Sequence, residues 1–125
     1  MSHDMFDLRL PPSAEHLATA RSFAASVARH YDVGGEAVED LKIAISEACI
    51  DALVAGTAIR VRAEEIGRAV AFVVEAPDVP ETPEEAILDE LGAPARLELI
   101  RSLFPDVVVG SDDGRRTITF SLQLA

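Results

Sequence analysis

Residues Glu39–Leu53 read EDLKIAISEACIDAL, and this stretch decides the fold. At about 100° per residue, a helix here gathers its apolar side chains into one stripe, made of Leu41, Ile45, Ala48 and Ala52. Another face carries Asp40, Glu47 and Asp51, with Glu36 one turn earlier. Because Glu47 and Asp51 are four residues apart, their like charges repel each other slightly. The helix therefore either exposes this acidic face to solvent or uses it.

The charge balance limits the partners of the chain. Its 125 residues are 49% hydrophobic, which suits one domain spanning residues 1–125 with a core of ordinary size. There are 22 acidic residues against 11 basic ones, so the formal net charge is -11. Because nucleic-acid backbones and anionic membranes would repel such a chain, we expect neither as a partner. A basic protein surface is a partner compatible with this charge.

Cysteine and histidine predict neither a disulfide framework nor a metal site. Cys49 is the single cysteine, and it falls on the apolar side of the helix, where we expect a buried packing role. His3, His16 and His30 are scattered without the spacing of a metal-binding pair. No run approaches the roughly 18 apolar residues of a membrane span, and the first residues lack the pattern of a signal peptide. We expect a cytoplasmic protein.

The first half of the chain predicts one strand and two helices. Residues 5–10 alternate apolar and polar, as a half-buried strand does. Ser13 is the expected N-cap of a helix whose apolar side carries Leu17, Ala20, Ala24, Val27 and Tyr31. The glycines at 34–35 should end this helix and release the chain into a second one, from residue 36 to about 55. Gly56 should end the second helix.

The second half predicts two hairpins separated by a loop and short helices. Strands are expected at 58–64, 69–75, 106–109 and 117–124, with turns at Gly67 and at Asp113–Gly114. Residues 77–83 hold prolines and should form a loop, followed by helices at 84–91 and 95–103. Residues 75–90 hold seven acidic side chains and no basic one, and most should coat a solvated surface. The fold class is α+β: a two-layer sandwich of helices on one face of a mostly antiparallel sheet.

The helix at 39–52 resembles the signature helix of the anti-sigma-factor serine kinases, which belong to the GHKL ATPases. That family helix reads Glu-Asp-Leu-Lys-x-Ala-Val-x-Glu-Ala-x-x-Asn-Ala, against EDLKIAISEACIDA here. The order of elements also resembles the GHKL fold along nearly the whole chain. The segment LIRSL at 99–103, followed by a valine-rich strand, is similar to a later family segment.

The resemblance implies roles for two acidic residues of this helix. Glu47 stands where the family has the general base that activates a partner's serine for phosphorylation. Asp51 stands where the family has the asparagine that holds the Mg²⁺ bridging the ATP phosphates. A carboxylate can bind Mg²⁺, but it adds negative charge beside the phosphates.

The nucleotide-binding boxes of the family are altered here. Where the family has Asp-x-Gly-x-Gly, this chain has EAPDVP at 75–80, with either Ala76 or Asp78 in the place of the aspartate and no glycine between Arg68 and Leu91. The phosphate-covering Gly-Leu-Gly-Leu is similar in position to residues 94–97, PARL, which include Arg96. Proline removes a backbone donor that such a lid needs.

The last strand differs from the family too. Arg116 replaces the threonine expected just before Thr117, and the pair at 115–116 fits the solvated end of a hairpin. Any remnant of a nucleotide site would consist of Asp51, Asp78, Arg96 and Thr117. We therefore expect no bound cofactor; ATP and Mg²⁺ would be present only if the chain is active.

Three hypotheses remain from the sequence. The first is a non-catalytic regulator that binds a sigma factor or a STAS-type anti-anti-sigma protein. The second is an active ATP-dependent serine kinase that phosphorylates such a STAS partner with Glu47 as base. The third is a homodimer that serves as a scaffold. Three roles remain open for Glu47: a solvated helix residue, a contact to a partner protein, or the catalytic base.

Overall fold

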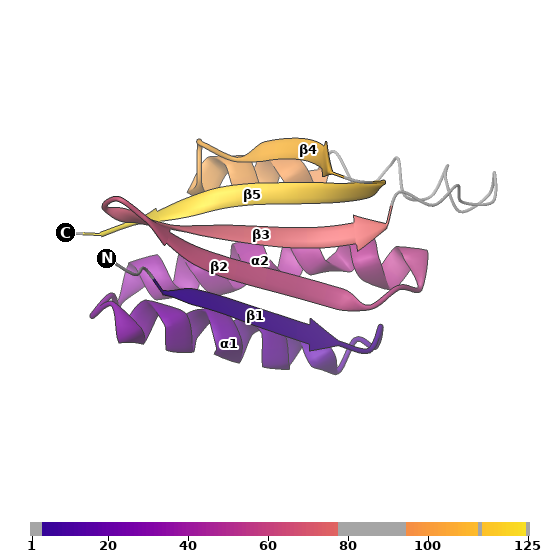
Figure 1. Ribbon diagram of the computed structural model, residues 1–125, viewed down its shortest axis with the longest axis horizontal. Coiled ribbons are helices and arrows are strands. Elements are labelled where there is room, and N and C mark those ends of the chain that lie inside the picture. Colours follow the sequence, from indigo (N-terminus) through magenta and orange to yellow (C-terminus); the bar gives the residue numbers. More distant parts are fainter. Residues whose placement is uncertain (1–3, 78–94, 113, 125) are drawn as a thin grey trace.

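The fold is a single antiparallel sheet with helices on one of its faces (Figure 1). A computed structural model describes residues 4–77, 95–112 and 114–124. Five strands are paired in the order β1-β2-β3-β5-β4, and every neighbouring pair is antiparallel. The predicted α+β architecture is confirmed.

The strands follow the predicted hairpins closely. They are β1 (Met5–Leu10), β2 (Ile59–Ile66), β3 (Ala69–Pro77), β4 (Val108–Asp112) and β5 (Arg115–Gln123). Gly67 and Gly114 have φ of 62° and 75°, so both turns use the left-handed region, which glycine enters without steric cost. Several boundaries differ from prediction by one to three residues: β2 ends at 66 rather than at 64, and β5 begins at 115 rather than at 117. The strand β4 spans 108–112 rather than 106–109, and β3 continues through Pro77, where a loop was predicted.

Two helices fill most of the second layer. They are α1 (His16–His30) and α2 (Glu36–Ala55), and residues 95–103 are helical as predicted. The predicted N-cap of α1 was wrong: Glu15 occupies that position, and the Ser13 hydroxyl instead lies 3.4 Å from a Glu15 carboxylate oxygen. The predicted end of α1 at the glycines 34–35 was too late. The helix ends at His30 with Tyr31 as its C-cap, and Asp32 takes a left-handed φ of 59° before the glycines.

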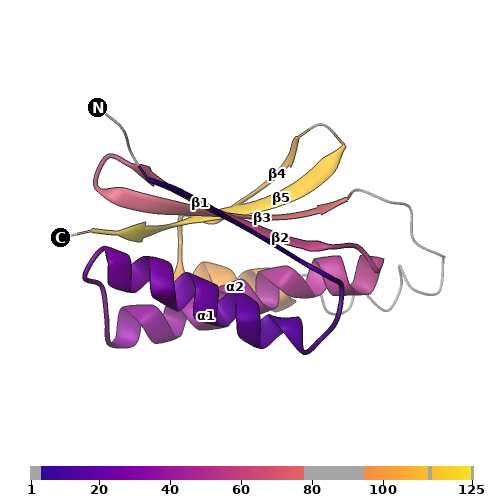
Figure 2. The same cartoon turned by 60° about the horizontal axis from the view of Figure 1, so that its bottom comes forward.

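The core lies between the helices and the inner face of the sheet. The predicted stripe of α2 is fully buried, and it packs with alternate strand residues such as Val61, Phe72 and Phe120. Figure 2 shows α1 and α2 side by side under the sheet, with the helical segment 95–103 in the same layer. Ile100 of that segment is buried in the same core.

The opposite, outer face of the sheet has no described helix against it (Figures 1 and 2). Its positions alternate with the buried ones and include Asp7, Arg62, Val73 and Thr119, which are paired in register across the sheet. An antiparallel sheet can keep one face in water in this way.

Both ends of the described chain bond to the β2–β3 hairpin. The Glu65 N–H donates to the carbonyl of Asp4 (3.1 Å), and the Leu124 N–H donates to the carbonyl of Arg68 (2.8 Å). The predicted loop at 78–83 and helix at 84–91 lie outside the described residues. Within the described residues, no helix is long and apolar enough to cross a membrane.

Candidate functional site

Glu47 is a half-buried residue on the flank of α2 that is turned away from α1. On the neighbouring flank, the Ser46 hydroxyl accepts a hydrogen bond of 2.9 Å from the Arg21 guanidinium of α1. Because successive helix residues are about 100° apart, Ser46 and Glu47 lie on opposite flanks of the buried stripe of α2. The solvent side between these flanks exposes apolar side chains: Ile43 is 43% exposed and Val54 41%.

Two other predicted site residues lie outside what the structure describes. Asp51 belongs to α2 one turn after Glu47, but its side chain is outside the described residues. Asp78 follows the end of β3 and is wholly outside them. The structure therefore places the backbone of position 51 beside Glu47 and leaves Asp78 unplaced.

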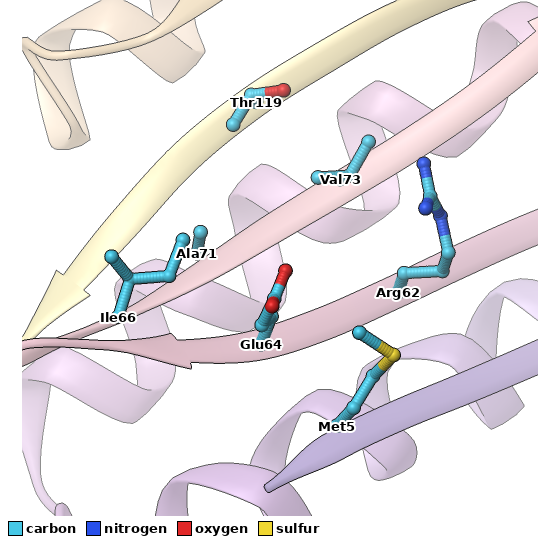
Figure 3. A pocket seen from close by; sticks show the side chains of 7 residues that line it. All are labelled: Met5, Arg62, Glu64, Ile66, Ala71, Val73 and Thr119. Carbon is cyan, nitrogen blue, oxygen red and sulfur yellow. The ribbon is translucent and has the colours of Figure 1, made fainter. Parts of the chain in front are cut away.

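Thr117 does not share a site with Glu47. It pairs with Glu75 and Gly110 in the sheet. Because it is two residues before Thr119 in β5, it points to the same outer face as Thr119, which Figure 3 shows. A Cβ built on Gly110 would meet the Thr117 hydroxyl oxygen at 3.2 Å, so this side chain leans along that outer face. The sheet thus separates Thr117 from α2.

Arg116 is on the inner face instead, one residue away along β5. It alternates with Thr117 and shares the side of the sheet on which Ile118 and Phe120 are buried. Arg116 is half-buried there. The position that resembles the family's threonine therefore carries a guanidinium on the helix side of the sheet.

Arg96 is the second residue of the helical segment 95–103 and is half-buried. This segment lies in the helix layer beneath β5 and β4, as Figures 1 and 2 both show. Of the predicted site residues, Glu47 and Arg96 therefore share a layer, whereas Thr117 is on the far side of the sheet.

Glu75, the one described member of the acidic stretch at 75–90, is buried and so is an exception to the solvation predicted for most of that stretch. Glu75 is only 5% exposed although it is on the outer face. Its carboxylate lies 3.3 Å from both the Arg60 and the Arg62 guanidinium groups. A buried carboxylate needs such partners, because desolvation of an unpaired charge is costly.

The same cluster extends to β1. Arg60 also donates to both carboxylate oxygens of Asp7, at 3.0 and 3.3 Å. This hydrogen bond from Arg60 lowers the pKa of the Asp7 carboxyl below its usual value. The pair therefore stabilises the fold above the ordinary pKa of Asp7, and this contribution is lost as the pH falls through the lowered one.

Sequence reasoning missed this outer-face ion cluster, formed by Asp7, Arg60, Arg62 and Glu75. The alternation of arginine with apolar residues at 59–63 was the available signal, since it marks 60 and 62 as outer positions. The pairing with Glu75 depends on the register between β2 and β3, which the sequence did not specify.

The remaining titratable groups offer no nucleophile or metal centre in the described parts of the chain. Burial raises the pKa of the Cys49 thiol to about 12, so it stays protonated and unreactive, and its predicted burial is confirmed. His30 lies 2.8 Å from Asp4, and its ring contacts those of Phe6 and Tyr31. Among the described residues, no three His, Cys, Asp or Glu side chains are grouped to hold a metal ion.

Comparison with known families agrees with this architecture. The family model of the histidine kinase-like ATPase domain matches residues 10–122. The chain therefore belongs to this family of the GHKL superfamily, and the resemblance found in α2 is confirmed at that level. A comparison with curated proteins finds no significant match.

Proposed function

We propose that this chain is a regulatory, non-catalytic member of its family, of the anti-sigma type, which acts by binding a protein. Its partner would be a sigma factor or a STAS-type anti-anti-sigma protein. The proposal rests on one observation above others: Glu75 and Thr117, two polar residues near the altered adenine box, are directed away from α2. Glu75 is held by two arginines and Thr117 leans along the outer face, whereas Arg116 is on the inner side.

These placements matter because an ATP site needs convergent groups. Adenine recognition requires a hydrogen-bond acceptor facing the nucleotide, and the phosphates require backbone N–H donors or a metal. The carboxylate of Glu75, the first residue of the stretch at 75–80, already has cationic partners on the opposite face. Together with the glycine-free segment between Arg68 and Leu91, this favours a chain that holds no nucleotide.

The surface of α2 supports protein binding. Ile43 and Val54 are exposed on its solvent side, and Glu47 is half-buried beside them. Exposed apolar side chains rimmed by charged ones are typical of interaction sites. The net charge of -11 would steer a basic partner toward the molecule and speed its association.

Titration calorimetry with Mg-ATP tests the first part of the proposal. We expect no binding heat at concentrations up to about 1 mM, the upper end of ordinary substrate affinities. A clear isotherm would contradict the absence of bound nucleotide and favour the alternative, an active serine kinase; transfer of the γ-phosphate to a STAS-type protein would establish that alternative.

Two charge-matched variants test the role of Glu47. Glu47→Gln and Glu39→Gln remove the same charge from the same helix, but Glu39 is exposed and paired with Lys42 at 3.4 Å. We expect both variants to bind and inhibit the partner like the unmodified chain, within about twofold. A Glu47→Gln variant that binds normally but loses all regulation, beside an unaffected Glu39→Gln, would contradict the proposal.

A further inference from the structure

Strand β4 is one of the two edges of the sheet, and among the described residues it is paired with β5 alone (Figure 1). In an antiparallel pair, alternate residues direct their backbone N–H and C=O groups away from the partner strand. In the described part of the chain, the outward groups of β4 therefore have no partner strand. An edge of this kind can pair with an extended segment of another molecule.

The side chains of β4 expose apolar surface on both faces of this edge. Val108 pairs with Thr119 and so belongs to the outer face, where it is 61% exposed. Val109 pairs with Ile118 on the inner face, yet it is still 41% exposed, so the helix layer leaves the edge partly uncovered. An added strand would cover part of both valines and remove apolar surface from water.

The opposite edge, β1, is protected in ways that β4 is not. Natural sheets block exposed edges with charged side chains, with proline or with a covering element. Asp7 and Arg9 are outer positions of β1, and Asp7 is paired with Arg60 of the next strand. On the inner side, the ring of Phe6 contacts the ring of Tyr31 at the end of α1. By contrast, β4 reads VVGSD, without lysine, arginine or proline.

Gly110, in the middle of β4, suits the approach of another backbone. A glycine inside a strand packs no side chain and often marks a place where a second backbone comes close. Gly110 does not have a positive φ, so no left-handed turn requires a glycine there. A Cβ at this position would meet the Thr117 hydroxyl oxygen at 3.2 Å, so the glycine keeps the outer side of the edge low.

From these observations we infer that the edge of β4 binds an extended segment of a partner protein, which joins the sheet as a sixth strand. This segment carries apolar side chains beside Val108 and Val109, and basic ones toward the end of β4 at Asp112. The inference concerns a surface other than that of α2 and does not rest on the proposed function.

Charge favours a basic segment as the occupant. Residues 104–112 contain two aspartates and no basic residue. Arg115 and Arg116 are paired with Asp112 and Ser111, but they belong to β5, one strand farther from the edge. The net charge of -11 repels both an acidic segment and a second copy of the chain. A basic segment therefore fits this edge better than a second copy does.

Titration of the full chain with a synthetic peptide tests the inference by NMR. The peptide KVTVKVTVK, with blocked ends, is basic and alternates valine with polar residues. We expect it to shift the amide signals of residues 108–112, with a dissociation constant of about 100 µM. The control peptide KVPVKVPVK has the same charge, but its prolines prevent continuous strand pairing. It should bind at least about 10-fold more weakly.

Two matched variants locate the binding surface. Val108 and Ile66 are both outer residues of the sheet, 61% and 59% exposed, but only Val108 is at the β4 edge. Val108→Lys should weaken binding of the first peptide at least about 10-fold, because it places a positive charge beside a basic segment. Ile66→Lys should change binding by less than about twofold. Thermal unfolding of both variants verifies that they remain folded.

Four outcomes would overturn the inference. They are shifts that map to α2 and not to β4, equal binding of the two peptides, equal effects of the two variants, and no binding of either peptide up to about 1 mM. Signals of residues 108–112 that broaden as the concentration of the chain rises, without peptide, would also overturn it. The edge would then be occupied by a second copy.

Discussion

Gly56 ends α2 in a left-handed conformation with φ of 69°. Its N–H donates to the carbonyl of Leu53, and the next N–H, of Thr57, donates to that of Ala52. These two bonds satisfy carbonyls that the end of a helix would otherwise leave unpaired. No atom lies within 4 Å of a Cβ built at Gly56, so the cost of a side chain there is purely conformational.

We expect Gly56→Ala to lower the free energy of unfolding by about 1 kcal/mol, the cost of a non-glycine residue in the left-handed region. Gly34→Ala is the control, because Gly34 has equally open surroundings but no left-handed φ. That variant should be neutral or more stable by about 0.5 kcal/mol, since it restricts the unfolded chain. Urea denaturation measures both, and equal effects would contradict this account of the helix end.

At the scale of single elements, the fold holds two kinds of ion pair, one in the sheet and one in a helix. Glu75 of β3 is buried between two half-buried arginines of β2. Glu98 of the helical segment 95–103 pairs with Arg101 at 2.6 Å, but both side chains are largely exposed. Judged by distance alone, the second pair would contribute more to stability. Judged by burial, the first pair contributes more.

We expect Glu75→Ala to lower the free energy of unfolding by about 1–2 kcal/mol, because it takes the buried carboxylate away from Arg62 and leaves Arg60 with Asp7 alone. The arginines keep some access to water, which limits the loss. Glu98→Ala should change stability by less than about 0.5 kcal/mol. Thermal or urea unfolding of the two variants in the same buffer measures the contrast, and a larger loss for Glu98→Ala would refute it.

Elements with strong local signals could be predicted from the sequence. The bounds of α2 followed from its apolar stripe and from Gly35 and Gly56 at its ends. Boundaries without such signals could not be predicted: Asp32, and not a glycine, makes the left-handed turn after α1. At the candidate site, the alternation around Ile118 already implied that Thr117 is on the outer face, although the family resemblance groups Thr117 with residues of α2. The partners of Glu75 could not be found, because strand register sets them.

At the scale of the whole molecule, the net charge of -11 opposes compactness. Screening by salt should therefore raise the melting temperature, by about 3 °C between low salt and about 0.5 M NaCl at pH 7.5. At pH 4.5, close to the sequence pI of about 4.5, the same salt step should produce little change. Differential scanning fluorimetry measures both, and a similar rise at the two pH values would point to a cause other than charge.

The hydrogen bonds of Asp4 and Leu124 to the two sides of the β2–β3 turn bring the ends of the described chain to the same corner of the sheet. A short glycine-rich linker could therefore close the chain into a ring. New ends opened between α1 and α2, at the glycines 34–35, would interrupt no strand and no helix. Such a circular permutant offers attachment points beside α2, well away from the outer face of the sheet, for sensors or surface immobilisation.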